Sequence, residues 1–177
     1  MDKKWHCKFK FAVVDRVKQV GNFTIEGKEL TPSSFVPARS RPNDTGYDVR
    51  CAQTGGMLIK PGQYFMMPLG IRSLPEEGWW YELKPRSGTF IKKHISALYG
   101  TVDFSWQGEL MFAGVYLPDS RQLIKDLKVE YGEKIAQIIP VKRVEMLPEE
   151  ISNEEIDAAY ALDTERGANG FNSSGNA

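Results

Sequence analysis

The sequence predicts an all-β protein with an antiparallel barrel-like or jelly-roll-like fold, little helix and a flexible C-terminal tail. Two observations predict this fold class. Apolar residues recur with a period of two along much of the chain, and short turns containing Gly or Pro separate these stretches. A length of 177 residues, 41% of them hydrophobic, suits one domain with a full core.

The expected strands follow one another with turn signals between them. Residues 8–14 alternate and then run apolar, and residues 57–71 read as two strands because Pro61-Gly62 interrupts them. The other expected strands are 47–52, 79–83, 110–117, 127–130 and 135–144. One short helix is expected over 153–162, with an N-cap and early acidic residues. We therefore expect a β domain over 1–163, in which 1–34 form an extension or the first strands, and a flexible arm over 164–177.

Charge and cysteine content exclude several classes of protein. The 23 Lys and Arg residues balance 23 Asp and Glu residues, so binding to nucleic acid or to a membrane surface through bulk positive charge is not expected. No stretch is apolar and long enough for a membrane span, and the N-terminus does not resemble a signal peptide. Cys7 and Cys51 form no CxxC pair. These features predict a cytoplasmic protein with reduced thiols.

Two segments carry residue types suited to phosphate chemistry. In the segment 84–89, Arg86 and Ser87 offer donors to phosphate oxygens and Gly88 allows close approach, although a plain surface turn explains the hexapeptide equally well. The segment 100–109 places Asp103 in a hairpin, either as a turn residue or as a base that activates water. The segment 21–28 approaches a P-loop, but its spacing is one residue too long and Glu29 replaces the Ser or Thr.

Two further segments are less specific. Gln137 lies within an apolar run, where its amide needs a polar partner, and this favours a position that faces a ligand. The final residues, 166–177, are rich in Gly, Ser and Asn and cannot pack a core. They read either as a polar tail or as a segment that orders over an anion, with Arg166 supplying charge and Phe171 a stacking face.

Taken in order, these segments resemble the motifs of the dUTP pyrophosphatase (dUTPase) family, which is trimeric and all-β. The segments that carry the resemblance are 44–49 (DTGYDV), 85–88 (PRSG), 100–108, 132–137 and 166–175, so it covers roughly residues 35–175. The resemblance implies hydrolysis of dUTP to dUMP and pyrophosphate, which keeps uracil out of DNA and supplies dUMP for thymidylate synthesis.

The resemblance also implies roles for individual residues. Asp103 would be the general base that activates a water for in-line attack on the α-phosphorus, and Asp48 would support the phosphate end of the site. A magnesium ion would be held by the substrate phosphates and waters, without a direct protein ligand. The implied substrate-binding residues are Arg86, Ser87, Gly88, Gly100, Thr101, Val102, Trp106, Met111, Gln137, Arg166, Gly170, Phe171, Ser173 and Ser174. The family further implies a homotrimer in which neighbouring subunits share each site.

Several positions depart from the family pattern and keep other functions open. Trp106 stands where Tyr is usual, Ala97 where Asn is common and Asn172 where Gly is usual. A dCTP deaminase of the same fold also carries Trp in its third motif, but it needs a glutamate where this chain has Ala113. A non-catalytic nucleotide-binding or interaction protein is the other alternative, and the retained Asp103 argues against it. If the chain is viral, the cytoplasm in question is that of the host.

Overall fold

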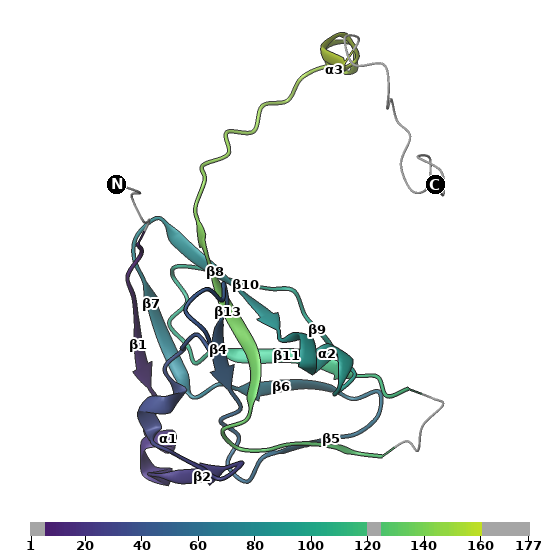
Figure 1. Ribbon diagram of the computed structural model, residues 1–177. Helices are drawn as coiled ribbons and strands as arrows, with labels where there is room; N and C mark the ends of the chain where they lie inside the picture. Colours follow the sequence, from purple (N-terminus) through teal and green to yellow (C-terminus); the bar gives the residue numbers. More distant parts are fainter. Residues whose placement is uncertain (1–5, 120–124, 161–177) are drawn as a thin grey trace. The chain divides into compact units, whose positions relative to one another are not determined.

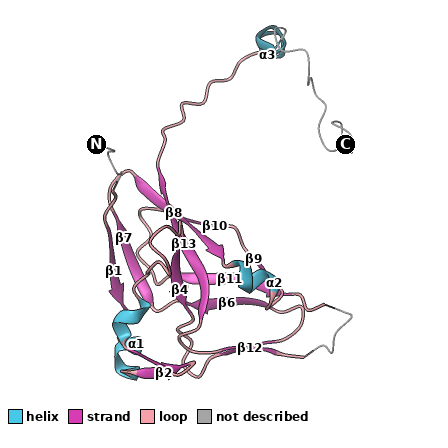
Figure 2. Ribbon diagram, in the orientation of Figure 1, coloured by secondary structure: helices cyan, strands magenta, loops and turns pink. Residues whose placement is uncertain are grey.

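The computed structural model describes residues 6–119 and 125–160 (Figure 1). The chain divides into two compact units, Met1–Arg143 and Val144–Ala177. Strands dominate the first unit, with short helices between them (Figure 2). Among the described residues, no helix has the length and apolar content to cross a membrane.

The N-terminal segment of the first unit adds four elements around one edge of the domain. Strand β1 (Phe9–Val13) pairs with β7 (Ile71–Pro75), and helix α1 (Asp15–Val20) follows it. Strands β2 (Phe23–Ile25) and β3 (Lys28–Leu30) then form a hairpin, and the 3-10 turn η1 (Pro32–Phe35) leads into the domain. The hairpin turns through Glu26 and Gly27, both with positive φ (49° and 74°), as a two-residue type I′ turn requires.

A four-stranded antiparallel sheet carries most of the motif segments. Its order is β10 (Gly100–Val102), β8 (Trp79–Pro85), β13 (Lys134–Lys142) and β4 (Tyr47–Arg50). In this register Gln137 lies opposite Lys84 on one side and opposite Asp48 on the other. The sheet therefore places segments that are far apart in the sequence side by side (Figure 1).

The remaining strands complete the domain around one core. Strands β6 (Tyr64–Pro68), β11 (Met111–Tyr116) and β9 (Ile95–Ala97) form a second sheet, and β12 (Leu127–Val129) pairs with β5 (Met57–Ile59). Side chains from all of these layers pack together with no exposure, among them Phe35, Val49, Met67, Tyr81 and Ile135. Within the described part of the chain the sheets do not close into a barrel, and their packing is jelly-roll-like. The expected all-β fold class is confirmed.

Each expected strand is present, but short elements escaped prediction. The stretch 57–71 contains β5, β6 and the first residue of β7, and the unpredicted elements include β9, β10 and helix α2 (Ser87–Ile91). Helix α3 (Asn153–Tyr160) lies in the second unit, where Ser152 and Glu155 form a capping box: the Glu155 N–H donates to Ser152 Oγ, and the Ser152 N–H donates to Glu155 Oε2. The domain boundary expected after residue 163 stays a prediction, and it falls outside the described residues.

Candidate active site

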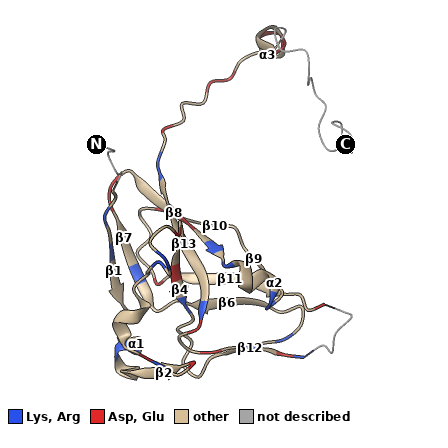
Figure 3. Ribbon diagram, viewed as in Figure 1, with Lys and Arg blue, Asp and Glu red and all other residues tan. Residues whose placement is uncertain are grey.

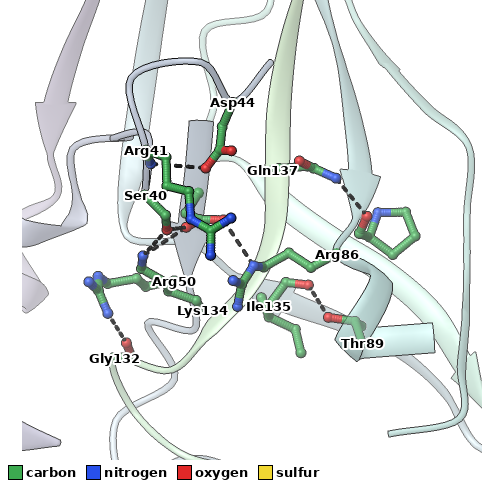
Figure 4. A network of polar contacts seen from close by, with 12 residues as sticks. Ser40, Arg41, Asp44, Arg50, Arg86, Thr89, Gly132, Lys134, Ile135 and Gln137 are labelled. Atoms are coloured by element: carbon green, nitrogen blue, oxygen red, sulfur yellow. Dashed lines mark hydrogen bonds and ion pairs between the residues drawn. The ribbon is translucent and has the colours of Figure 1, made fainter. Parts of the chain in front are cut away.

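The carboxylate of Asp48 lies at the centre of a polar cluster where β4, β13 and the end of β8 meet (Figure 4). Arg86 Nε lies 2.9 Å from Asp48 Oδ1, and Lys134 Nζ lies 2.7 Å from Oδ2. The Ser40 hydroxyl donates to Oδ2 at 2.6 Å and accepts from Lys134 Nζ at 2.7 Å. We call Ser40, Asp48, Arg86 and Lys134 the Asp48 cluster.

The electrostatics of this cluster keep Asp48 ionised. Burial alone raises the pKa of its carboxyl, but hydrogen bonds from Lys134 and Ser40 and the charges of Arg86 and Lys134 outweigh burial and hold the pKa below its usual value. Both carboxylate oxygens are occupied by these partners. Asp48 therefore holds the heads of two cations in place.

Hydrogen bonds to residues of β13 hold the turn that follows β8 in place. Gln137 Nε2 donates to the Pro85 carbonyl at 3.1 Å, and the buried Thr89 hydroxyl donates to the Ile135 carbonyl at 2.5 Å (Figure 4). The partner that the sequence required for the Gln137 amide is thus a main-chain carbonyl. A Cβ atom at Gly46 would lie 1.9 Å from Gln137 Oε1, so any other residue at position 46 would have to displace this amide.

A cavity opens next to the Asp48 cluster on the side of helix α2. It consists of two neighbouring lobes with volumes of about 340 and 560 Å³. The two lobes share Arg86, Glu133 and Lys134 in their linings. The lobe beside α2 is lined mainly by Arg86, Ser87, Gly88, Thr89, Lys92 and Lys93. Ser87 is exposed, and a Cβ at Gly88 would meet no atom within 4 Å. Cations, a hydroxyl and an open backbone are the groups that bind phosphate oxygens.

Such a binding site need not show as a single basic face. Figure 3 shows Lys and Arg residues distributed over the domain together with Asp and Glu. This distribution agrees with the formal net charge of zero. The cationic character is therefore local to the cavity beside Arg86 and Lys134.

The turn that follows β10, residues 103–109, presents a second group of predicted residues, and we call β10 with this turn the β10 hairpin. It is not the pair of adjacent strands that the sequence predicted, because in the described residues β10 pairs with β8, whereas the next strand, β11, pairs with β6 and β9. Asp103, Phe104 and Trp106 are all exposed in the turn after β10. The main-chain N–H of Trp106 donates to the Asp103 carbonyl at 3.1 Å. The indole covers Gly108, where a Cβ would lie 2.4 Å from the ring. The turn thus holds its carboxylate and its aromatic ring toward solvent.

An ion pair that the sequence did not indicate supports this hairpin. Both terminal nitrogens of Arg16, on α1, donate to the Glu109 carboxylate, and the Gly70 N–H donates to Glu109 Oε1 at 2.7 Å. Arg72 Nε also donates to the Gln107 carbonyl at 2.8 Å. The base of the hairpin is therefore fastened to β7 and to the N-terminal segment.

Within one chain the two groups of residues do not meet. Strands β10 and β8 are antiparallel, and Val102 lies opposite Tyr81. Asp103 therefore lies beyond Tyr81 toward the start of β8, whereas Arg86 follows the end of β8, five residues after Tyr81. At about 3.3 Å per residue, this register separates the level of Asp103 from Arg86 by roughly 16 Å or more along the strand. Asp103 therefore cannot act on a phosphate that its own Arg86 binds.

The predicted residues fall into three sets, with Met111 apart from them. Asp48, Arg86, Ser87, Gly88 and Gln137 come together at the Asp48 cluster, and a separate set occupies the hairpin: Gly100, Thr101, Val102, Asp103 and Trp106. Met111 lies at the start of β11, opposite Pro68. The last set, Arg166, Gly170, Phe171, Ser173 and Ser174, lies outside the described residues. Sequence reasoning missed Lys134, although it lies within the fourth motif.

The donor sets do not make a metal-binding centre of their own. Across 6–119 and 125–160, no three His, Cys, Asp or Glu side chains gather as ligands. At Asp48, a metal ion would have to displace Arg86 and Lys134 from the carboxylate. The residues present fit a divalent cation only as one carried by a bound triphosphate, with the protein contacting the phosphates.

The fold and these two polar regions define an all-β protein with a pocket lined by cations beside Asp48, and comparison with known proteins identifies its family. The dUTPase family model matches residues 33–175. A deoxyuridine 5'-triphosphate nucleotidohydrolase of Leptospira interrogans is 32% identical over 151 residues, which is 84% of this chain and 96% of the relative. One from Rhodococcus erythropolis is 33% identical over 156 residues, 87% of each chain. The chain belongs to the dUTPase family, and the expectation of a dUTPase-type enzyme is confirmed.

Solved structures show the same fold. A mutant dUTPase of Staphylococcus bacteriophage 80alpha with dUpNHpp superimposes with a TM-score of 0.69 at 17% identity, covering 96% of this chain and 99% of that one. The dUTPase of Streptococcus mutans gives a TM-score of 0.60 at 18% identity, covering 78% and 98%. Ala113, the position at which the resemblance to the deaminase would need a glutamate, lies in β11 opposite Met66.

Proposed function

We propose that this chain hydrolyses dUTP to dUMP and pyrophosphate at sites that are shared between copies in a homotrimer. The observation that carries the proposal is the separation of the Asp48 cluster from the hairpin of Asp103 within one chain. A phosphate group bound at Arg86 of one copy needs a carboxylate from another. The names of the relatives, and the dUpNHpp bound to the phage 80alpha dUTPase, support dUTP as the substrate.

The hairpin supplies recognition and the base. Asp103 aligns a water for in-line attack on the α-phosphorus and accepts its proton on the carboxylate. This carboxylate is exposed in the single chain, before substrate binds. The backbone of 100–102 reads the uracil edge, and the ring of Trp106 packs against the deoxyribose, where a 2′-hydroxyl would collide with it. This ring is 51% exposed in the single chain, and it is therefore accessible to a sugar.

The Asp48 cluster supplies the phosphate contacts. Arg86 and the donors of Ser87 and Gly88 bind the phosphate chain, and Gln137 holds the turn that presents them. A Mg²⁺ ion carried by the triphosphate would neutralise charge on its oxygens, while Arg86, Ser87 and Gly88 contact the phosphates. A mutant phage phi11 dUTPase is described with a structural Mg(II) ion. The residues Arg166, Phe171, Ser173 and Ser174 of the C-terminal arm, with Gly170, would close over the substrate.

Exposed apolar residues support assembly of several copies. Phe90 and Ile91 of α2 and Leu98 and Tyr99 after β9 are between 62% and 88% exposed. Contiguous exposed apolar residues of this kind mark protein interfaces. A cytoplasmic location and a role in keeping uracil out of DNA, while supplying dUMP, belong to the same proposal.

The test compares dUTP, dCTP, dTTP and UTP as substrates with Mg²⁺, and measures pyrophosphate, the nucleotide product and the mass of the assembly in solution. We expect turnover of dUTP, weak turnover of UTP and a trimer. Deaminated product from dCTP would establish the deaminase instead. Binding of dUTP without turnover would establish a binding protein, and a monomer that turns over dUTP at full rate would contradict the shared site.

A further inference from the structure

The N-terminal hairpin β2–β3 forms one wall of the second lobe of the phosphate cavity. This lobe has a volume of about 340 Å³. From the hairpin it is lined by Ile25, Glu26, Lys28 and Leu30, and from the domain by Arg50, Arg86, Gly132, Glu133 and Lys134. The hairpin precedes residue 33, where the match to the dUTPase family begins. It therefore lies outside the part of the chain that the family model matches, next to a site built from the matched motifs.

Aromatic packing fixes the hairpin in this position. The ring of Phe23 lies 4.8 Å from that of Tyr131 and 5.8 Å from that of Phe35, measured between ring centroids. Phe23 also covers Gly132, where a Cβ would lie 2.2 Å from its ring. Such contacts anchor β2 on the domain, so the wall of the lobe is built into the fold.

The lobe contains two cations, Arg50 and Lys28, that form no ion pair with a carboxylate within the described residues. Arg50 donates to the carbonyls of Ser34 (3.0 Å) and Gly132 (2.7 Å), as Figure 4 shows for Gly132. Burial lowers the pKa of Arg50, Asp48 raises it, and the nearby Arg86 lowers it again. Lys28 makes no ion pair within 6–119 and 125–160.

The acidic residues of the lobe do not cancel this charge. Glu133 is paired with Lys93 at 2.6 Å. Asp48, behind the lobe, is already shared by Arg86 and Lys134. Glu26 occupies the tip of the hairpin turn and is exposed to solvent. An anion with two adjacent charged groups would therefore meet Lys28 and Arg50 in the same lobe as Arg86 and Lys134.

We propose that this hairpin lobe is a binding subsite for a pyrophosphate group, in which Lys28 and Arg50 supplement Arg86 and Lys134. The group comes either from the two terminal phosphates of the nucleotide or from free pyrophosphate. This inference rests on the proposed function only where the group belongs to bound dUTP, and not where it is free pyrophosphate. Lys28 is then a residue that selects nucleotides by the length of their phosphate chain.

The experiment uses the full chain and the variants Lys28→Ala and Lys28→Arg, with Lys60→Ala as the matched control. Lys60 is an exposed lysine in the turn after β5, outside both lobes. Binding of inorganic pyrophosphate and of dUMP is measured by calorimetry, and KM and kcat are measured with dUTP. Loss of one charge-assisted contact should weaken pyrophosphate binding about fivefold to tenfold in Lys28→Ala. Binding of dUMP should stay unchanged, and Lys28→Arg should retain most of the affinity.

The outcomes separate the two sources and the two proposals. A parallel rise in the KM for dUTP assigns the lobe to the bound nucleotide, whereas weaker pyrophosphate inhibition with an unchanged KM assigns it to the free product. Equal pyrophosphate affinity in Lys28→Ala and Lys60→Ala would overturn the subsite, and so would an equal loss of dUMP binding. If the wild type fails to hydrolyse dUTP, the proposed function fails, while the pyrophosphate titration still decides the subsite.

Discussion

The Asp48 cluster and the β10 hairpin are built in opposite ways. In the cluster, one carboxylate accepts contacts from Arg86, Lys134 and Ser40 within 2.9 Å, and its side chain is only 10% exposed. In the hairpin, Asp103 and Trp106 lie exposed in a turn whose fixed point is its base, at Glu109. The difference teaches that the cations around Asp48 are organised within one chain, whereas the Asp103 carboxylate is left exposed, as the proposed sharing of sites between copies requires.

The largest effect should come from the hairpin. Asp103→Asn removes the proposed base with little change in shape, so kcat for dUTP should fall by about 10² to 10⁴-fold. Binding of dUpNHpp, measured by calorimetry, should stay within about threefold of the wild type because the Asp48 cluster is intact. A variant that turns over normally would remove Asp103 from the chemistry and undo the contrast between the regions.

The next effect should come from the cluster. Arg86→Gln removes a charged donor to phosphate and one partner of Asp48, and KM for dUTP should rise by about tenfold to a hundredfold. The control is Arg39→Gln, since Arg39 stacks on Tyr47 and contacts Pro42 without touching Asp48. Steady-state kinetics that showed equal KM values for the two variants would contradict a role for Arg86 in binding.

A smaller effect should come from the base of the hairpin. Arg16→Met leaves Glu109 with the Gly70 N–H alone, and the free energy of unfolding should fall by about 1 kcal/mol because the pair is partly exposed. The kcat for dUTP should fall severalfold while pyrophosphate affinity stays unchanged. Lys18→Met, on the same helix, removes an exposed pair with Asp15 and should change neither quantity. A loss of pyrophosphate binding in Arg16→Met would show that the two regions are coupled.

The smallest effect concerns the pH dependence of stability. The folded pKa of Asp48 lies below that of the unfolded chain, where the carboxyl binds its proton first. Its contribution is therefore fully present above the ordinary pKa of aspartate and is lost as the pH falls through the folded value. Urea unfolding at several pH values below neutrality should show a smaller loss in Lys134→Met, completed at a higher pH, because the folded pKa of Asp48 is less depressed there while the unfolded pKa is unchanged. An unchanged acid limb in that variant would mean that Lys134 does not lower the pKa.

Alternating apolar residues were enough to predict the long strands of both regions, because each strand buries one face. The contacts inside the Asp48 cluster were not predictable in this way. A register shift between Lys134 and Ala136 in the β13–β4 pair sets which β13 residue meets Asp48. Gln137 was recognisable as needing a partner, but the Pro85 carbonyl follows only from the β8–β13 register.

The supports of the hairpin gave even less signal in the sequence. Arg16 and Glu109 are 93 residues apart, and each alone reads as an ordinary surface charge. The segment 21–28 was recognised as too long for a P-loop, and in the structure its second half forms β2 and the Glu26-Gly27 turn. Local composition could not reveal that this turn lies beside Arg50 and Lys134, because that contact depends on the packing of Phe23.

The position of β13 between β8 and β4 also sets the order in which the protein can be assembled during its synthesis. Asp48 emerges early from the ribosome, but Lys134 and the rest of β13 are made near the end of the domain. At 5–20 residues per second, β4 waits roughly 5 to 20 s for this strand. During that interval β4 and β8 expose unpaired edges, which are sites of aggregation. A chain whose synthesis ends before Lys134 would therefore leave the edges of β4 and β8 unpaired. Its Asp48 carboxylate would also lack the contact that Lys134 makes to Oδ2.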